Sequence, residues 1–243
     1  MDDGGDDRRL CPNILREHDR GTTTAPVRRG LLPVHLDEPV GDPLVPQEQR
    51  LAIIEHSASG PARTYSYAQL QASADRFSQL LHRSGVCKGD RVALVLPQRF
   101  ETAAAYMGIL QMGAVAMPLS LLFGPEALSY RLIDSGAVAA VVDEQSIQNL
   151  ISVRPQCPAL RTLVGVGAAA KACDEPWPDG PVHRPAHPWP PVNTLASDPA
   201  ILIYTSGTTG PPKGALIPHQ ALIGNLTGFV CSQNWFGFDP ADH

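Results

Sequence analysis

The sequence has no long apolar run, no excess of basic residues and no paired cysteines, and each absence narrows the possible functions. A helix that spans a bilayer needs roughly 20 apolar residues, whereas the apolar runs here are short ones such as Val92–Leu96. The formal net charge of −5 argues against general affinity for nucleic acid or anionic membranes, which both draw on clustered Lys and Arg. We therefore expect no membrane span and no nucleic-acid partner, and small molecules are the favoured partners.

The cysteines and the N-terminus argue against further classes of protein. The five cysteines are scattered and never form a C-x-x-C pair, so neither a disulfide framework nor a zinc site is indicated. The N-terminus is acidic, whereas a secretory signal needs positive charge before an apolar run and a transit peptide avoids acids. No targeting segment is found, and a soluble, cytoplasmic protein is expected.

The composition is that of an ordinary globular protein. Its 243 residues, 43% of them hydrophobic and 18% charged, allow one large domain or two small ones, since domains usually have roughly 100–200 residues. Residues 1–30 are polar and lack a hydrophobic period, which predicts a disordered extension. We interpret residues 31–166 as a first α/β subdomain, residues 167–199 as a proline-rich connection, and residues 200–243 as the start of a second subdomain.

Short apolar runs alternate with helical patterns between residues 51 and 166. Strands are predicted at 51–55, 63–67, 92–96, 114–119, 138–142 and 162–166, and helices near 70–81, 100–110, 125–133 and 146–153. Several of the runs are apolar on both faces, as a strand covered by helices on each side requires. The alternation predicts an α/β fold with a mostly parallel sheet flanked by helices.

The connection at 167–199 differs in character from the residues before it. Its many prolines remove backbone donors and fix φ, which argues against regular structure. His183 and His187 lie within it, but a proline separates them and no cysteine or acid completes a set of metal ligands. We interpret both as surface histidines.

The segment Ala200–Gly214 leads from a predicted buried strand into a loop rich in hydroxyl groups. Its glycines remove Cβ atoms, so successive backbone N–H groups can turn toward one oxyanion. Its hydroxyl groups and single lysine add donors and a compact positive charge, which suit the oxygens of a polyphosphate. The predicted nucleotide-binding residues are Thr205, Ser206, Gly207, Thr208, Thr209, Gly210 and Lys213.

The loop is not a Walker A loop, because that motif places its lysine between Gly and Ser or Thr, whereas Lys213 lies between Pro212 and Gly214. A linker without function is the alternative interpretation. It does not account for the combination of a strand, ordered hydroxyls, Pro-Pro-Lys-Gly and a following helix. That helix is expected to begin near His219 with its N-terminus facing the loop, and His219 is assigned a capping or packing role in preference to ligand contact.

Residues Tyr204–Gly214 are similar throughout to Y-T-S-G-T-T-G-x-P-K-G, the phosphate-loop signature of the adenylate-forming enzyme superfamily. Segments 64–67, 85–92, 113–119 and 130–137 resemble the same superfamily in the same order. From Leu44 onward the chain therefore resembles the N-terminal part of an AMP-forming acyl-CoA synthetase. The aromatic residues Trp235, Phe236 and Phe238 resemble a stretch in acetyl- and medium-chain-acyl-type members.

The resemblance implies a ligase that works in two steps. A carboxylate attacks the α-phosphate of Mg·ATP to give acyl-AMP and pyrophosphate, and the thiol of coenzyme A then displaces AMP. ATP, Mg²⁺ and coenzyme A are the implied cofactors and co-substrates, with a small carboxylic acid as substrate. By position, Thr205–Gly210 and Lys213 would hold the β- and γ-phosphates and stabilise the departing pyrophosphate. No catalytic residue is identified, and the metal ligands stay open.

The later elements of the superfamily, including a mobile C-terminal domain with a catalytic lysine, are absent from these 243 residues. The chain is therefore expected to be a truncated part of such an enzyme. Two other interpretations stay open. One is a non-catalytic remnant that binds nucleotide or packs against a partner, such as a chain carrying the missing half. The other is an adenylation domain that loads a carrier protein.

We predict that the isolated 243-residue polypeptide completes no acyl-CoA synthesis, because the resemblance places the catalytic lysine outside it. Purified protein should show no carboxylate-dependent exchange of radiolabelled pyrophosphate into ATP. A complete ligase of the superfamily is the positive control. Exchange above background with any carboxylic acid would contradict this expectation.

Overall fold

The structure is a computed structural model that describes residues 50–56, 60–180, 189–190, 192–205 and 211–224. Several predictions fall outside these residues. They concern the extension at 1–30, the histidines His183 and His187, the aromatic residues at 235–238, and the loop residues Ser206, Gly207, Thr208, Thr209 and Gly210.

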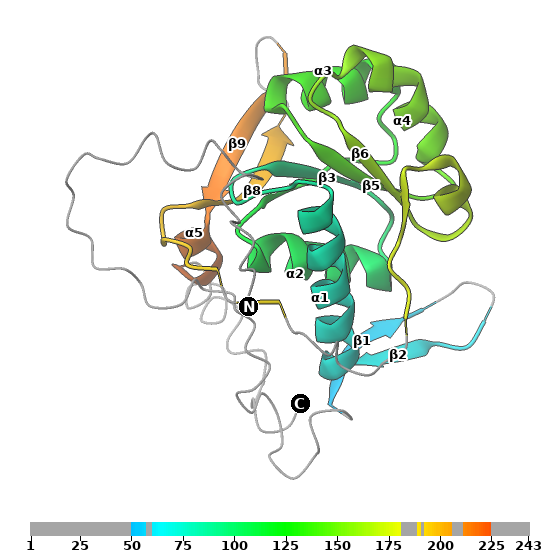
Figure 1. The fold of residues 1–243 in the computed structure, drawn as a ribbon, viewed down its shortest axis with the longest axis vertical. Coiled ribbons are helices and arrows are strands. Elements are labelled where there is room, and N and C mark those ends of the chain that lie inside the picture. The colour runs from blue at the N-terminus through cyan, green and yellow to red at the C-terminus, as the bar shows by residue number, and fades with distance from the viewer. Residues whose placement is uncertain (1–49, 57–59, 181–188, 191, 206–210, 225–243) are drawn as a thin grey trace, which may run out of the picture.

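The described residues form strands and helices in alternation (Figure 1). The strands are β1 (Leu51–Glu55), β2 (Arg63–Ser66), β3 (Arg91–Val95), β4 (Val115–Pro118), β5 (Ala139–Val142), β6 (Thr162–Gly165), β7 (Glu175–Pro176), β8 (Pro199–Thr205) and β9 (Lys213–Pro218). The α-helices are α1 (Tyr67–Arg83), α2 (Phe100–Gln111), α3 (Pro125–Ser135), α4 (Ile147–Val153) and α5 (His219–Gly224), and the 3₁₀ helices are η3 (Arg154–Gln156) and η4 (Gly167–Ala172).

Seven strands form one sheet in the order β7-β6-β5-β3-β4-β8-β9, and β1 and β2 form a separate antiparallel pair. Within the large sheet, every neighbouring pair is parallel except β8 and β9. The predicted α/β fold with a mostly parallel sheet is therefore confirmed. The strand β8 joins β4 in register Ala116↔Ile201, so the described parts of the two predicted subdomains share one sheet. The division of the chain into domains stays a prediction.

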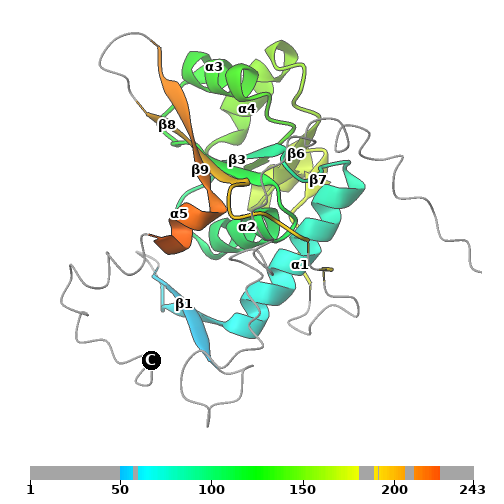
Figure 2. The ribbon, with the colours of Figure 1, turned by 90° about the vertical axis from the view of Figure 1, so that its left-hand side faces the viewer.

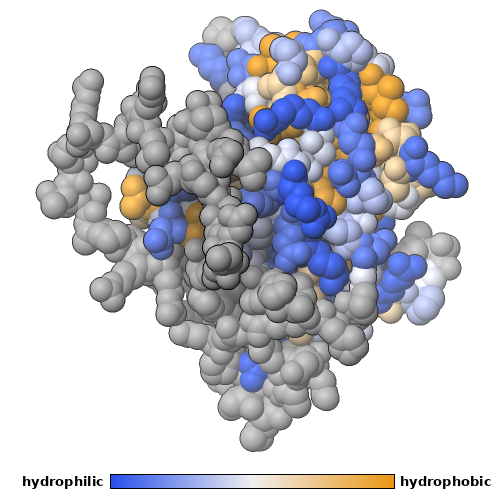
Figure 3. Space-filling model, in the orientation of Figure 1, coloured by the Kyte–Doolittle hydropathy of each residue, from blue (hydrophilic) through white to orange (hydrophobic). Residues whose placement is uncertain are grey.

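The sheet has a hydrophobic core on each face. In β3, Val92 and Leu94 belong to the core that α1 and α2 cover, whereas Ala93 and Val95 belong to the core under α3 and α4. Because successive side chains of a strand point to opposite faces, a continuous apolar run is what this two-sided burial requires. Figures 1 and 2 show the two helix pairs on opposite sides of the sheet. On the outer surface of α3 and α4, apolar residues are interspersed with hydrophilic ones (Figure 3).

The helix boundaries follow local signals in the sequence. The hydroxyl of Ser66 accepts a hydrogen bond from the backbone N–H of Gln69, and the Gln69 side chain accepts one from the Ser66 N–H, which makes a capping box at the start of α1. The helix α3 begins with Pro125 and ends before Gly136, whose φ of 60° lies in the left-handed region. The helix α3 begins where the predicted helix at 125–133 begins and ends two residues later.

Two segments differ from the prediction. The connection at 167–199 was expected to lack regular structure, but it begins with η4 and the two-residue β7, because the crowded prolines start only at Pro176. The strand β9 intervenes between the loop and α5, where a helix was expected to follow the loop directly. Its apolar residues Ala215, Leu216 and Ile217 pair with β8 in an extended conformation.

The cysteines show one departure from expectation. Cys87 is disulfide-bonded, whereas Cys157 and Cys173 are free thiols. The scattered spacing had indicated no disulfide framework.

Among the described residues, no helix combines the length and the apolarity that crossing a bilayer would require.

We predict that Phe77→Ala destabilises the fold by about 3–5 kcal/mol, the usual cost of truncating a buried aromatic side chain. Phe77 is fully buried in the core under α1 and α2 and stacks on Trp177 with ring centroids 4.7 Å apart. Leu122→Ala, at a residue that is 93% exposed, should change the free energy of unfolding little. Urea denaturation followed by circular dichroism measures both, and equal stability of the two variants would refute the assignment of this core.

Candidate functional site

The predicted phosphate loop connects the two strands of one β-hairpin. Thr205 is the last residue of β8, Lys213 is the first of β9, and the two are paired across the antiparallel ladder. Paired residues in such a ladder have their Cα atoms about 5 Å apart. Both residues are exposed, so a hydroxyl and an ammonium group lie side by side at the loop end of the hairpin. The cradle predicted for residues 206–210 lies outside the described residues.

Gly214, the last residue of the signature, packs closely against side chains of the neighbouring strand. It pairs with Tyr204 across the hairpin. A Cβ atom at this position would lie 2.9 Å from Cδ1 of Leu202 and 3.4 Å from Cζ of Tyr204. The first distance is shorter than a carbon–carbon contact allows, so a side chain here would displace the tip of the Leu202 side chain.

Tyr204 joins the base of the hairpin to α3. Its hydroxyl donates a hydrogen bond of 2.6 Å to Oδ2 of Asp134. Desolvation by burial and this bond to a carboxylate raise the pKa of Tyr204 far above its ordinary value, so the phenol stays protonated. Asp134 is thus the acceptor that anchors β8 to α3.

Two neighbours of Asp134 on α3 also reach the hairpin. The hydroxyl of Tyr130 donates a 3.0 Å hydrogen bond to the carbonyl of Pro212, directly before Lys213. The guanidinium of Arg131 lies 4.0 Å from the ring centroid of Phe123 and 5.6 Å from that of Tyr204. No role was predicted from the sequence for Tyr130 or Arg131. The one available signal was their position in the segment 130–137, which resembles the superfamily.

His219 begins α5, as predicted, but the N-terminus of that helix does not face the phosphate loop. The six residues of β9 separate His219 from the loop, so the two lie at opposite ends of the hairpin, about 17–20 Å apart along the strand. The backbone N–H of His219 donates to the carbonyl of Asp198 at 3.0 Å. Its side chain is 1% exposed, and neither ring nitrogen has a hydrogen-bond partner among the described residues. The packing role is therefore the one that the geometry supports.

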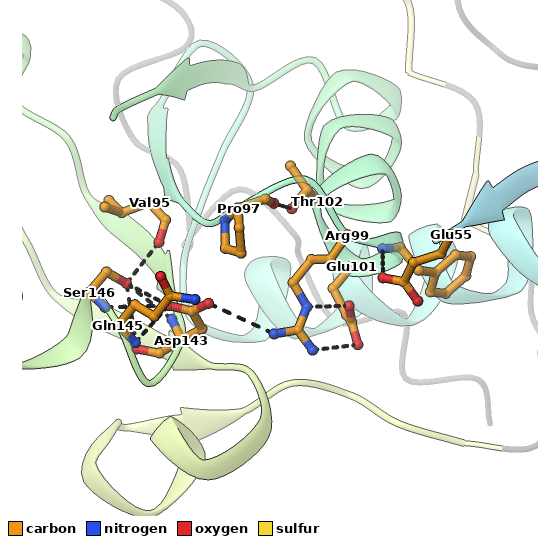
Figure 4. Close-up of polar contacts among 10 residues, drawn as sticks. Glu55, Val95, Pro97, Arg99, Glu101, Thr102, Asp143, Gln145 and Ser146 are labelled. Atoms are coloured by element: carbon orange, nitrogen blue, oxygen red, sulfur yellow. Dashed lines mark hydrogen bonds and ion pairs between the residues drawn. The ribbon is translucent and has the colours of Figure 1, made fainter. Parts of the chain in front are cut away.

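A second polar cluster lies at the carboxyl ends of β3 and β5 (Figure 4). Oδ1 of the fully buried Asp143 accepts hydrogen bonds from the backbone N–H groups of Gln145 and Ser146, so this acid has a structural role. The Ser146 hydroxyl donates to the carbonyl of Val95 at 2.7 Å. Arg99 lies 3.8 Å from Oδ2 of Asp143. These contacts tie the loop after β5 to the loop after β3.

The same cluster continues to the small β1–β2 sheet. Arg99 forms a 2.7 Å ion pair with Glu101 in the first turn of α2. The carboxylate of Glu55, at the end of β1, accepts a hydrogen bond of 3.2 Å from the backbone N–H of Phe100. Because Arg99 itself makes no side-chain cap, Glu55 supplies the acceptor for a free N–H group of α2.

The charged groups near the hairpin are compatible with an anionic ligand. Lys213 forms no ion pair with any residue that the structure describes. Among the residues that the structure describes, no group of three or more His, Cys, Asp or Glu residues could hold a metal ion.

The fold and the hairpin match those of a known enzyme family. Residues 45–243 match the model of the AMP-binding enzyme family, and the chain belongs to that family. The resemblance seen in the sequence is thereby confirmed.

Proteins of more than one function are similar to this chain. The long-chain-fatty-acid–CoA ligase FadD13 of Mycobacterium tuberculosis is 32% identical over 160 residues, which cover 65% of this chain and 30% of that protein. A dimodular nonribosomal peptide synthase of Bacillus subtilis is 30% identical over 178 residues, covering 73% of this chain and 7% of that protein. The chain thus spans less than a third of the length of these relatives.

A solved structure supports the fold assignment. The anthranilate CoA ligase AuaEII, in complex with anthranoyl-AMP, matches with a TM-score of 0.58 and 25% identity. The match covers 71% of this chain and 33% of that one.

Burial makes His219 a source of pH-dependent stability. Desolvation lowers its pKa, and the neighbouring carboxylate of Asp198 opposes this only in part. Because the pKa is lower in the folded than in the unfolded chain, the unfolded chain binds more protons below about pH 6.5. The free energy of unfolding therefore falls as the pH drops from there toward the folded pKa.

We predict that His219→Leu removes this part of the pH dependence. The variant should lose less stability than the wild type between about pH 7 and pH 5, the range in which an ordinary histidine takes up its proton. Urea denaturation at a series of pH values measures the effect. Identical pH slopes for the wild type and His219→Leu would rule the mechanism out.

Proposed function

We propose that this chain is the part of an AMP-forming acyl-CoA synthetase that binds the phosphates of ATP. The observation that carries the proposal is the pairing of Thr205 with Lys213, which places the two ends of the signature at one exposed hairpin end. Membership of the AMP-binding family supports the reaction class. The similarity to a long-chain-fatty-acid–CoA ligase supports a carboxylic acid as substrate and coenzyme A as acceptor.

Bound Mg·ATP supplies the electrophilic α-phosphorus and pyrophosphate as leaving group. The carboxylate oxygen forms a bond to that phosphorus as the bond to the bridging oxygen breaks, which yields acyl-AMP and pyrophosphate. The thiol of coenzyme A then displaces AMP from the acyl carbon and loses its proton. Both steps balance without an oxidant or a reductant.

In the proposed reaction, Lys213 and Thr205 act on the leaving group. The ammonium of Lys213 offers up to three donors to the β- and γ-phosphate oxygens, where negative charge develops as pyrophosphate departs. The hydroxyl of Thr205 donates from the opposite strand. Ser206, Gly207, Thr208, Thr209 and Gly210 are proposed to complete the site with backbone N–H groups and hydroxyls.

An adenylation domain that loads a carrier protein is the second candidate, because a nonribosomal peptide synthase is similar over 73% of this chain. Both candidates share the phosphate-binding step and differ in the acceptor of the acyl group. Sequencing the gene beyond the codon for His243 separates them. A downstream carrier segment in the same frame would favour the peptide-synthase class, and its absence would favour coenzyme A.

We predict that Lys213→Ala weakens the binding of Mg²⁺–pyrophosphate by about tenfold or more, the loss expected for one charge-assisted hydrogen-bonding group. Isothermal titration of the full 243-residue chain measures the dissociation constant. Lys171→Ala is the matched control, because Lys171 is an exposed lysine in η4, away from the hairpin. Equal affinity of the two variants, or no binding by the wild type, would contradict the proposal.

A further inference from the structure

The helix α3 contacts both strands of the hairpin that carries the phosphate loop. Tyr130 donates to the carbonyl of Pro212 on the side of β9, and Asp134 accepts from Tyr204 on the side of β8. Tyr130 and Asp134 are four residues apart, which places them on the same face of the helix. Figures 1 and 2 both show α3 beside the end of the hairpin where the loop begins.

The bond to Pro212 controls the orientation of Lys213. A peptide unit is planar, so the carbonyl of Pro212 and the backbone nitrogen of Lys213 move as one body. The proline ring also fixes φ of Pro212 near −65°. A hydrogen bond of 3.0 Å from Tyr130 to this carbonyl therefore fixes the plane from which the Lys213 side chain starts.

The contacts at Tyr204 hold the opposite strand in the same way. The 2.6 Å bond to Asp134 fixes the tip of the Tyr204 ring, and Tyr204 directly precedes Thr205. The ring of Tyr130 packs edge-on against that of Tyr204, with centroids 6.5 Å apart. The two hydrogen bonds thus form one connected cluster.

We propose that Tyr130 and Asp134 are positioning residues, which set the relative placement of Lys213 and Thr205 for a polyphosphate ligand. This inference rests on the proposed function of the loop. Neither residue touches the ligand itself. They hold the two ends of the loop on a helix whose other side is fixed in the core by the buried residues Leu128 and Leu132.

Removal of single hydroxyl groups tests the proposal. Tyr130→Phe and Tyr204→Phe each delete one donor and keep the ring. Tyr106→Phe is the matched control, because Tyr106 is a half-buried tyrosine on α2 whose hydroxyl donates to no residue that the structure describes. Asp134→Ala deletes the acceptor, whereas Asp134→Asn keeps an acceptor oxygen and should restore the wild-type behaviour.

Two measurements on the full chain separate positioning from phosphate binding. The first is the rate of tryptic cleavage at the Lys213–Gly214 bond, followed by mass spectrometry without any ligand. The loss of either hydrogen bond should raise this rate by about fivefold. The second is the dissociation constant of Mg²⁺–pyrophosphate, which should rise by a similar factor in the same variants, while the melting temperature stays within the range of Tyr106→Phe.

The outcomes are distinct. Faster cleavage and weaker binding in Tyr130→Phe, Tyr204→Phe and Asp134→Ala, with Asp134→Asn and Tyr106→Phe unchanged, establish the positioning role. Unchanged cleavage overturns it, whatever the pyrophosphate affinity. If the wild type binds no pyrophosphate, the proposed function fails, and the cleavage rates alone decide whether α3 holds the hairpin. A fall in melting temperature equal for all tyrosine variants would also overturn the specific role.

Discussion

The burial of parallel strands on both faces is the constraint on which the rest of the structure depends. Strands such as β5, with all four residues buried, exist only because α1 and α2 cover one face of the sheet while α3 and α4 cover the other. This arrangement fixes the position of β4, and β4 in turn pairs with β8. The core therefore places, through β4, the hairpin that carries the proposed phosphate loop.

The position of β9 at the end of the described sheet order leaves one end of the hairpin available for the proposed role in binding. In the seven-stranded order β9 has one neighbour, β8, and its first four residues are exposed. The groups at the hairpin end are therefore not needed for packing. In the central strands, a lysine at the equivalent place would be buried without a partner, at a cost of several kcal/mol.

Much of the fold could be predicted because its signals are local. Apolar runs identified β3 and β5, and apolar residues at helical spacing identified α1 and α3. The strand β9 was missed because its short apolar run, Ala215–Ile217, follows a loop and fits a helix start equally well. Only its pairing with β8 decides the conformation. The same reason explains β7, whose two residues become a strand by pairing with β6.

The candidate site was predicted in part. The residues Thr205 and Lys213 follow from a contiguous pattern, which a single sequence displays. Their supports do not, because Tyr130 and Pro212 are 82 positions apart and Tyr204 and Asp134 are 70 apart. The acid Glu55 caps α2 from a distance of 45 residues in the same manner. Contacts of this kind depend on how the layers pack, and no local pattern encodes them.

The antiparallel direction of β9 governs where the polypeptide goes next. A parallel strand would have ended at the same edge of the sheet as the nucleotide loop, but β9 carries the backbone away from that edge and delivers α5 on the far side. Any segment that follows α5 and returns to the edge of the sheet where the proposed phosphate loop begins must therefore travel back across the full height of the sheet.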